Sequence, residues 1–323
     1  MDHPLDRARA RLQGRKCRIV FPEGDDPRIR EAAGTMTASF PELSAVLIGG
    51  DTTVGNGHRH PRLTFVAPDG EQDADQLADL YIRNRPGTAP AVARRFLRKP
   101  MYRAGLMLKA GLADCMVAGI SCPTARVIEA SMLTVGLQDG VAVPSSFFMM
   151  LVPGRAPVMF ADCAVNIAPT PQELAAIGMA SARSWKALMG TEPRTAFLSF
   201  STHGSASHAA ASAVKDAAEL AGRLCPAFSF EGELQADAAL NPRIAALKVK
   251  ARGSVSGQAN VLVFPNLDAA NIGYKLLQEL AGATALGPVL QGFARPVSDL
   301  SRGASVQDIV DTALMTAGMA LGA

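Results

Sequence analysis

Apolar runs alternate with amphipathic segments along most of the chain. The run CRIVF at residues 17–21 is followed by the turn PEGDD and by a helical pattern from residue 27. The same order recurs after ADCMVAG, RTAFLSF and ANVLVF, each of which precedes a Gly, Pro, Asp or Ser turn and a helix-like segment. Continuous apolar strands between amphipathic helices are typical of a parallel sheet covered on both faces. The pattern therefore predicts an α/β fold.

One segment departs from this order. In SSFFMMLVPGRAPVMFADCAV, residues 145–165, two apolar runs flank the turn PGRA. Two strand-like runs joined by so short a turn predict a hairpin, and hence an antiparallel pair. The sheet is therefore expected to be mixed, although mostly parallel.

Two helix starts carry clear capping signals. Asp26 can cap the helix that follows it, and Pro27 suits the first turn. Near the C-terminus, apolar positions keep helical spacing from residue 306 to residue 317. Ser305 then stands at the N-cap and Asp308 three residues later, a capping box with Asp in place of the commoner Glu. Asp308 also suits the positive end of the helix dipole.

The three residues Ser301, Arg302 and Gly303, just ahead of that helix, are not needed for a cap. Polar groups that converge at a helix N-terminus form a natural anion site. Two interpretations therefore remain open from spacing alone. Either the segment is a well-capped helix only, or it is also part of a reaction site.

A second polar loop, STHGSAS at residues 201–207, joins an apolar strand to a helix. Its backbone N–H groups and hydroxyls could cradle a phosphate, or it could be an ordinary connection. Either His203 or His208 beside it could contact a ligand, but both are interpreted as incidental. Further along, Glu231, Glu233 and Asp237 are interpreted as surface acids at a helix start rather than as paired catalytic acids.

Composition narrows the function classes. Hydrophobic residues make up 48% and charged residues 19% of 323 residues, which excludes a disordered chain. With 32 basic and 29 acidic residues the net charge is +3, so there is no footprint for nucleic acid and any anion site must be local. Neither a signal peptide nor an apolar segment long enough to span a membrane is recognised.

Cysteine and histidine usage points to a reducing compartment without a structural metal. The five cysteines are odd in number and form no C-x-x-C pair. Together with the five histidines, including His58 and His60, they make no zinc-binding pattern. We therefore expect free thiols, no metal and an intracellular location.

Several common catalytic motifs are absent. There is no G-x-x-x-x-G-K-[ST] and no G-x-S-x-G, and GNGHRH at residues 55–60 lacks the third glycine of a dinucleotide fingerprint. These absences argue against a P-loop nucleotide site, serine hydrolysis and hydride transfer.

An ordered set of segments nevertheless resembles one family. The set comprises IVFPEGDDPR, AGLADCMVAGISCPTARVI, ADCAVNIAPTPQELA, FLSFSTHGSAS, EGELQADAAL, ANVLVFPNLDAANIGYKLLQ, GPVLQG and PVSDLSRGASVQDIV. In this order they resemble the phosphate acetyltransferase (phosphotransacetylase) family in its short, single-module form. The chain is also similar to the ethanolamine-utilisation branch.

The resemblance implies reversible transfer of an acetyl group between coenzyme A and phosphate. Acetyl-CoA, phosphate and acetyl phosphate would be the substrates, and no cofactor is implied because coenzyme A is itself a substrate. It also implies a cytoplasmic homodimer whose two α/β/α domains enclose an active cleft. The first domain would comprise residues 1–140 and 290–323, and the second residues 141–289.

Specific residues are carried over by the resemblance. The catalytic serine, arginine and aspartate fall on Ser301, Arg302 and Asp308, and arginines that contact the coenzyme fall on Arg85 and Arg126. The loop residues expected to bind substrate are Ser201, Thr202, Gly204 and Ser205. Two departures, Cys115 where glycine is common and Ala304 where cysteine often follows SRG, remove none of these groups.

Three alternatives differ in chemistry. One is an acyltransferase for a longer group such as butyryl. Another is a non-catalytic module that binds acetyl-CoA as a signal, against which the complete set of Ser301, Arg302 and Asp308 argues. The third, a nicotinamide dehydrogenase on a related fold, is weakened by the missing glycine fingerprint and metal-binding acids.

Overall fold

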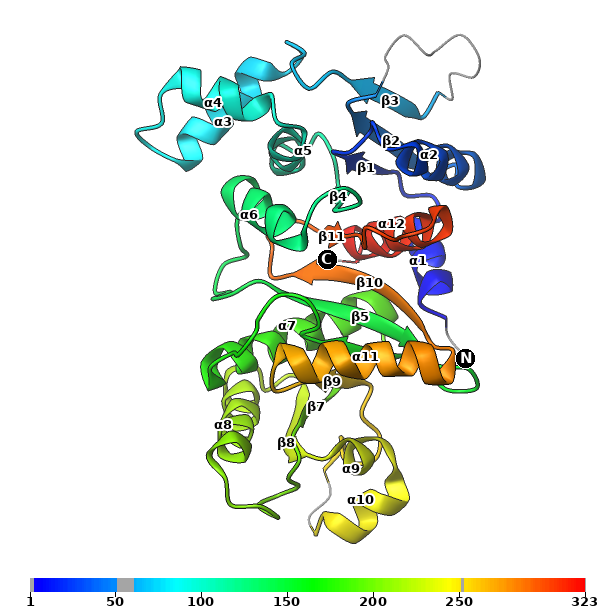
Figure 1. Cartoon of the computed structure of the whole chain (residues 1–323), viewed down its shortest axis with the longest axis vertical. Helices are drawn as coiled ribbons and strands as arrows, with labels where there is room; N and C mark the ends of the chain where they lie inside the picture. Colours follow the sequence, from blue (N-terminus) through cyan, green and yellow to red (C-terminus); the bar gives the residue numbers. More distant parts are fainter. Residues whose placement is uncertain (1–2, 51–60, 251–252, 323) are drawn as a thin grey trace. The chain divides into compact units, whose positions relative to one another are not determined.

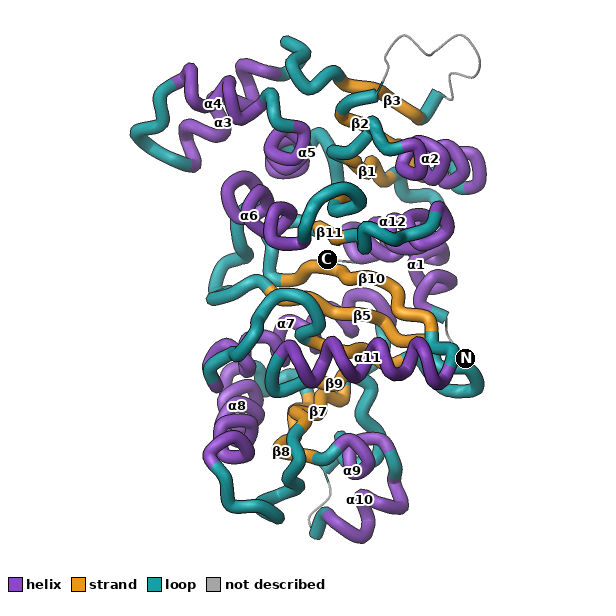
Figure 2. The backbone as a smooth tube through the Cα atoms, in the orientation of Figure 1, coloured by secondary structure: helices purple, strands orange, loops and turns teal. Residues whose placement is uncertain are grey.

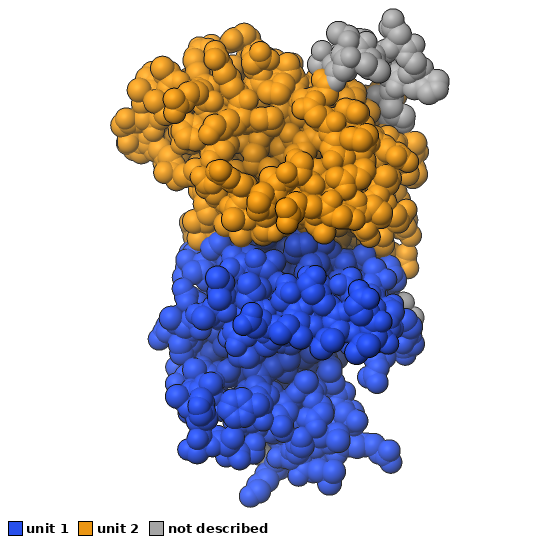
Figure 3. Space-filling view, viewed as in Figure 1, with its two compact units in different colours: residues 1–4, 140–292 blue, residues 5–139, 293–323 orange. Residues whose placement is uncertain are grey.

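Two compact units make up the chain (Figure 3). Unit 1 comprises residues 1–4 and 140–292, and unit 2 comprises residues 5–139 and 293–323. The structure, a computed structural model, describes residues 3–50, 61–250 and 253–322. The segment GNGHRH, with His58 and His60, lies outside the described residues.

The sheet of unit 2 is entirely parallel. Its strand order is β3-β2-β1-β4-β11. The strands are β1 (Cys17–Phe21), β2 (Leu43–Ile48), β3 (Leu63–Val66), β4 (Cys115–Ala118) and β11 (Val297–Asp299). Since β1 and β4 are buried along most of their lengths, their continuous apolar runs are those of a sheet covered on both faces.

Helices cover both faces of the unit 2 sheet (Figure 1). On one face lie α2 (Pro27–Ser39) and α12 (Val306–Ala320), with α1 (Pro4–Leu12) beside α12. On the other lie α5 (Pro100–Lys109) and α6 (Thr124–Thr134), while α3 (Ala74–Asn84) and α4 (Pro90–Leu97) pack on each other and on α5. Asp26 accepts a hydrogen bond from the Arg28 backbone N–H (2.8 Å), and Pro27 opens the helix, so this predicted start is confirmed.

The sheet of unit 1 is mixed, with strand order β10-β5-β6-β9-β7-β8. Its strands are β5 (Ser145–Leu151), β6 (Val158–Ala161), β7 (Arg194–Leu198), β8 (Ser229–Leu234), β9 (Val261–Val263) and β10 (Thr284–Gln291). The predicted hairpin is confirmed, because β5 and β6 pair antiparallel with Phe148 opposite Phe160. Strand β10 is also antiparallel to β5, whereas β6, β9, β7 and β8 run parallel. The predicted α/β class with mixed, mostly parallel sheets is thereby confirmed.

Helices also cover both faces of the unit 1 sheet, with α11 in front of the strands and α7 behind them in Figure 2. The elements are α7 (Pro171–Met189) and α8 (Ala209–Leu224) on one face, and α9 (Ala236–Leu240), α10 (Pro242–Lys248) and α11 (Leu267–Ala281) on the other. No helix in the described parts of the chain is both long and apolar enough to cross a membrane.

Close packing of α7 on β7 requires a glycine. A Cβ at Gly178 would lie 2.3 Å from Cζ of Phe197, which is fully buried. We expect Gly178→Ala to lower the free energy of unfolding by about 1–3 kcal/mol, because the core must be displaced to admit the methyl group. Urea unfolding measures this.

Gly222 provides the matched control, because it also lies within a helix of unit 1 but has no atom within 4 Å of the place that a Cβ would take. Gly222→Ala should raise stability by up to about 1 kcal/mol through helix propensity. Equal effects of the two substitutions would contradict the packing argument.

Candidate active site

The carboxyl ends of the parallel strands in unit 2 gather polar loops that the sequence singles out. Strands β1, β4 and β11 are neighbours, so the loops that follow them lie at the same edge of the sheet. These loops cover residues 22–26, 119–123 and 300–305. Ligands of open α/β sheets bind at this edge. The fold therefore brings the segment before α12 to a position where a site is expected.

Ser301 and Arg302 are exposed in the loop between β11 and α12. The Ser301 hydroxyl accepts a hydrogen bond from the Gly303 N–H (3.3 Å), and the Ser301 carbonyl accepts one from Ala304 (2.9 Å), so the loop is a tight turn. The Arg302 guanidinium has no acidic partner among the described residues. An arginine that is fixed at its backbone and unpaired at its head is suited to bind an anion in two places.

Asp308 forms the predicted capping box, which is confirmed. Its Oδ2 accepts hydrogen bonds from the backbone N–H (2.9 Å) and the hydroxyl (2.7 Å) of Ser305, and the Ser305 hydroxyl accepts one from the Asp308 N–H (3.2 Å). The carboxylate is exposed, and both bonds go to one oxygen. Asp308 is thus fixed at the start of α12, and its second oxygen takes no part in the capping box.

Arg28 holds the loop of Arg302 in place. Its Nη1 donates to the carbonyls of Arg302 (2.9 Å) and Ala304 (3.3 Å). The same guanidinium donates to both carboxylate oxygens of Asp26, at 3.1 and 2.8 Å. This side-chain hydrogen bond lowers the pKa of Asp26. The Arg28 side chain therefore links the start of α2 to backbone carbonyls of the loop before α12. The sequence alone does not indicate these contacts.

Glu23 fastens the loop that follows β4. Its Oε2 accepts from the N–H groups of Gly119 (2.6 Å) and Ile120 (3.1 Å). Its Oε1 accepts from the N–H (2.8 Å) and the hydroxyl (2.6 Å) of Ser121. Sequence patterns assign no role to Glu23 or Arg28. The only signal was their place in PEGDDPR, directly after a strand.

The two arginines expected to contact the coenzyme are both exposed in unit 2. Arg85 is the C-cap residue of α3, and its head makes no ion pair within the described residues. Arg126 lies in the first turn of α6, where its Nη1 is 3.0 Å from Oε2 of Glu129. Arg126 thus lies shortly after the loop that Glu23 binds, and its ion pair with Glu129 is exposed to solvent.

The loop of residues 201–206 in unit 1 is held by its own hydrogen bonds. Ser201 Oγ donates to Oε1 of Glu233 (2.9 Å), and the Gly204 N–H donates to the same oxygen (2.7 Å). The backbone N–H groups of Thr202, His203, Ser205 and Ala206 also have acceptors within the chain. No backbone donor of residues 202–206 is left for a phosphate in this arrangement, which favours the ordinary connection of the two interpretations that the sequence left open.

Hydroxyl groups of this loop differ in access. Ser201 and Thr202 are buried, whereas Gly204 and Ser205 are exposed. Thr202 Oγ1 accepts from the Gln235 N–H (3.0 Å), which ties the loop to the end of β8. The hydroxyls of Ser201 and Thr202 are therefore shielded from a ligand, whereas that of Ser205 lies in an exposed part of the loop.

Two interpretations of single residues near this loop need correction. Glu233 is 2% exposed and is therefore not a surface acid. His208 is not incidental, because its Nδ1 accepts from the Ala210 N–H (3.1 Å) and caps α8. His203 lies with Nε2 3.3 Å from Oε1 of Glu231. The contacts of Glu233 and Glu231 with this loop join residues about 30 positions apart, which the sequence patterns do not reveal.

The cysteines in the described residues are free thiols, as predicted. Cys122 lies in the loop before α6, where burial, together with the charges of Glu23 and Asp299, raises its pKa to about 12. Burial also raises the pKa of the Cys163 thiol. Thiols that stay protonated are poor nucleophiles, so these two cysteines do not suit a covalent acyl intermediate. Within the described residues no group of three or more His, Cys, Asp or Glu side chains could hold a metal ion.

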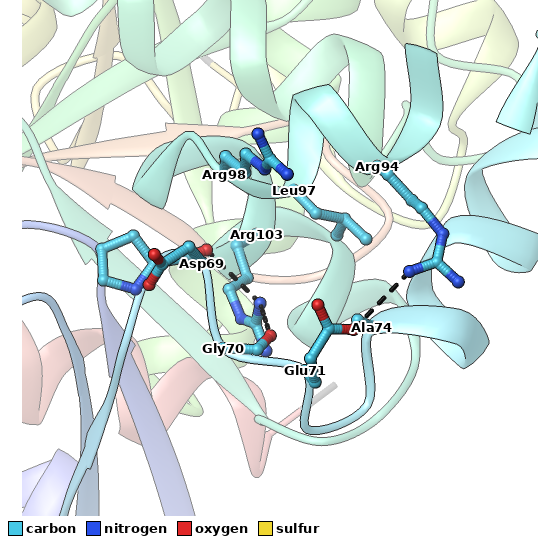
Figure 4. Close-up of a pocket in the computed structure, with 9 residues that line it drawn as sticks. Asp69, Gly70, Glu71, Ala74, Arg94, Leu97, Arg98 and Arg103 are labelled. Carbon is cyan, nitrogen blue, oxygen red and sulfur yellow. Dashed lines mark hydrogen bonds and ion pairs between the residues drawn. The ribbon is translucent and has the colours of Figure 1, made fainter. Parts of the chain in front are cut away.

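A small pocket in unit 2 is lined by three arginines but has a structural explanation (Figure 4). Arg103 is 2% exposed and donates to the carbonyl oxygens of Gly70 (2.8 Å) and Gln72 (2.5 Å). Arg94 lies 3.6 Å from Glu71, so acidic groups line the same pocket. The loops after β1, β4 and β11 contribute nothing to it. These contacts hold α4, α5 and the loop after β3 together, so the arginines of the pocket have a structural role.

Comparison with known proteins places the chain in one family. A family model described as "Phosphate acetyl/butaryl transferase" matches residues 5–317. A phosphate acetyltransferase of Paracoccus denitrificans is 39% identical over 322 residues, covering 97% of this chain and 98% of the relative.

Solved structures agree with this match along nearly the whole chain. A phosphotransacetylase from Streptococcus pyogenes is 36% identical with a TM-score of 0.92, covering 99% of this chain and 98% of that one. The EutD phosphotransacetylase from Staphylococcus aureus is 33% identical with a TM-score of 0.91, covering 98% of each chain.

These matches define an acyltransferase, the enzyme class that the sequence predicted. The chain belongs to the phosphate acetyl/butaryl transferase family. The resemblance seen in the sequence is thereby confirmed. The match to the relative from Paracoccus denitrificans extends over almost the full length of both chains.

Proposed function

We propose that this protein transfers an acetyl group reversibly between acetyl phosphate and coenzyme A, with Ser301, Arg302 and Asp308 as the reacting set. The observation that carries this proposal is the unpaired Arg302 guanidinium, among the described residues, beside an exposed hydroxyl and carboxylate at the carboxyl edge of the unit 2 sheet. The names of the relatives support acetyl as the acyl group.

The reaction places three demands on the site. The coenzyme A sulfur attacks the carbonyl carbon of acetyl phosphate, and a tetrahedral oxyanion forms. The bond from that carbon to the bridging oxygen then breaks, phosphate leaves, and the thiol proton is taken up. The site must therefore bind phosphate, stabilise the oxyanion and accept a proton.

Arg302 and Ser301 answer the first two demands. A guanidinium stays charged and grips two phosphate oxygens at once, so it stabilises the negative charge that develops on the leaving group. The Ser301 hydroxyl donates a hydrogen bond to the oxyanion or to the departing oxygen. Arg28 supports both residues, because it fixes the carbonyls of Arg302 and Ala304.

Asp308 accepts the thiol proton. A thiol is a much weaker acid than a carboxylic acid, so complete proton transfer from the thiol before attack is unfavourable. The sulfur's proton becomes far more acidic as the bond from sulfur to carbon forms. We therefore place the transfer within the attack, with substrates excluding water from the exposed Asp308 oxygen.

The remaining assignments are part of the same proposal. Arg85 and Arg126 contact the phosphates of coenzyme A, which their exposure in unit 2 supports. Ser201, Thr202, Gly204 and Ser205 form the substrate-facing loop of unit 1, in which Ser201 and Thr202 keep the shape and Ser205 meets the ligand. We take unit 2 as the first domain and unit 1 as the second, and the unpaired cysteines support a cytoplasmic location.

A thioester assay tests the activity. Purified protein is mixed with coenzyme A and acetyl phosphate, and the absorbance of the thioester is followed, with butyryl phosphate in a parallel reaction. Faster product formation from acetyl phosphate is expected. A preference for butyryl phosphate would reassign the acyl group. Absence of thioester from both donors would leave the non-catalytic acetyl-CoA-binding module as the better account.

We further propose a homodimer that buries an apolar stripe on α11. Ile272, Leu276 and Leu280 recur at four-residue spacing and are 57%, 51% and 82% exposed. Exposed apolar stripes of this kind mark protein interfaces. The double substitution Leu276→Glu and Leu280→Glu should therefore give a monomer in size-exclusion chromatography with light scattering, where the unchanged protein gives a dimer.

Leu224→Glu is the control, because Leu224 is 61% exposed at the end of α8, outside this stripe. It should leave the mass of the particle unchanged. A dimer that persists in the α11 variant would place the interface elsewhere.

A further inference from the structure

A buried carboxyl group lies two residues before Ser301 and has no role in the mechanism above. Asp299 ends strand β11 and is 2% exposed. Its Oδ2 accepts a hydrogen bond from Thr124 Oγ1, whereas its Oδ1 is buried without a partner among the described residues. Burial of a carboxyl with an unsatisfied oxygen destabilises a fold. Such a group needs an explanation other than stability.

The surroundings of Asp299 make room for it without neutralising it. A Cβ at Gly119 would lie 2.0 Å from Asp299 Oδ1, so the glycine after β4 leaves the space that the carboxyl occupies. The titratable groups that face it are Glu23, from the loop after β1, and Cys122, from the loop before α6. Neither supplies a positive charge.

These surroundings set when Asp299 ionises. Burial, to which the charge of Glu23 adds, raises the pKa of Asp299 to about 7, although the hydrogen bond from Thr124 opposes the shift. The carboxyl is therefore largely ionised at pH 8 and largely protonated at pH 6. The hydrogen bond from Thr124 to Asp299 is therefore strongest above pH 7, because a carboxylate is a stronger acceptor than a protonated carboxyl group.

Thr124 links this carboxyl to the proposed coenzyme contact. It is the first residue of α6, and Arg126 follows two residues later in the same turn. On the other side of the bond, Asp299 directly precedes the loop that carries Ser301 and Arg302. The bond between Thr124 and Asp299 therefore joins the element that carries Arg126 directly to the element that carries Arg302, and both belong to unit 2.

We propose that Asp299 is a positioning residue: through its hydrogen bond with Thr124 it holds Arg126 in place relative to the loop of Ser301 and Arg302. Its buried charge lowers the stability of the fold. The proposal rests on the proposed function, in particular on the contact between Arg126 and coenzyme A. It makes two predictions that a purely structural carboxyl would not: binding of coenzyme A depends on the bond, and removal of the charge stabilises the protein.

The first test separates KM from kcat. Thr124→Val removes the donor at nearly constant volume, and we expect KM for coenzyme A to rise about tenfold, with a smaller fall in kcat, as loss of one hydrogen bond to a charged group implies. Thr124→Ser, which keeps the hydroxyl, should restore most of the affinity. An unchanged KM in Thr124→Val would overturn the proposal.

Arg126→Gln distinguishes this failure from failure of the proposed function. If Arg126→Gln raises KM for coenzyme A but Thr124→Val does not, the positioning role is wrong and the coenzyme contact stands. If Thr124→Val alone raises KM, the bond matters but Arg126 is not the contact it serves, which overturns the proposal as stated. If neither changes KM, both assignments are wrong.

The second test uses Asp299→Asn, which keeps an acceptor for Thr124 but carries no charge at any pH. The native carboxyl retains its proton up to about pH 7, whereas in the unfolded chain it ionises near pH 3.9. Stability from this group is therefore full below that lower pH and is lost as pH rises through 7. Asp299→Asn should melt about 2–4 °C higher than the unchanged protein at pH 8, with little difference at pH 4.

The pH dependence of binding completes the test. The ratio of KM for coenzyme A in the unchanged protein to KM in Asp299→Asn should fall from pH 6 to pH 8. Over this range residue 299 becomes a carboxylate in the unchanged protein only. Comparison of the two proteins at each pH cancels the titration of coenzyme A itself. A variant that melts lower at pH 8, or a ratio of KM values that is flat with pH, would contradict the proposal.

Discussion

Arg302→Lys is expected to lower kcat by about 10²–10³-fold, although the charge is conserved. The ammonium of lysine is a point charge on a flexible stem and cannot grip two phosphate oxygens in a fixed plane. Loss of one preorganised donor to a developing negative charge lowers turnover by about this amount. In this structure the guanidinium has no acidic partner among the described residues, so its full charge is available to the leaving phosphate.

Steady-state kinetics with acetyl phosphate and coenzyme A measure the effect. Arg295→Lys is the matched control, because Arg295 is exposed just ahead of β11, at the opposite end of the strand that leads to Arg302. It should leave kcat unchanged. A near-normal kcat in Arg302→Lys would show that Arg302 supplies only a diffuse positive field, and the bidentate role would have to be abandoned.

Local sequence signals predicted the helix caps, the hairpin and several of the strands correctly. The caps at Asp26 and at Ser305 with Asp308 rest on contacts between residues two or three positions apart. Side-chain chemistry and spacing specify such contacts directly. The hairpin of β5 and β6 and the strands β1, β4, β7 and β9 follow from equally local patterns of apolar residues. For this reason the fold class is predictable from the amino-acid sequence alone.

The supports of the candidate site are non-local, and sequence patterns do not predict them. Glu23 and Ser121 are 98 positions apart, Thr124 and Asp299 are 175 apart, and Arg28 and Arg302 are 274 apart. Such pairs are set by strand order, which brings the loops after β1, β4 and β11 together. A hydrophobic pattern predicts that a sheet forms but does not say which loops become neighbours.

The same limit explains why the sequence left two interpretations open for the loop of residues 201–206. Its hydroxyls and glycine match a phosphate-binding composition, but the anion that its donors bind is the carboxylate of Glu233, at the end of the neighbouring strand β8. The composition of the loop is typical of anion binding, but it does not show whether the anion is a ligand or a carboxylate of the protein itself.

Asp308 raises the question whether a group that is explained as a helix cap also does chemistry, and two substitutions separate these roles. Asp308→Asn keeps the shape of the side chain but removes the proton acceptor, so we expect kcat to fall by about 10²–10⁴-fold. Ser305→Ala removes the hydroxyl half of the capping box while Asp308 keeps its charge. It should cost about 1 kcal/mol of stability.

The comparison of kcat with stability decides between the roles. If Asp308 acts only as a cap, Asp308→Asn and Ser305→Ala lower the free energy of unfolding to similar extents, and both retain near-normal kcat. If Asp308 accepts the thiol proton, kcat separates the two variants by at least about tenfold while urea unfolding does not. An exposed carboxylate with only one oxygen in the cap is suited to both tasks, because the cap fixes the position of the side chain and leaves the other oxygen outside the capping box.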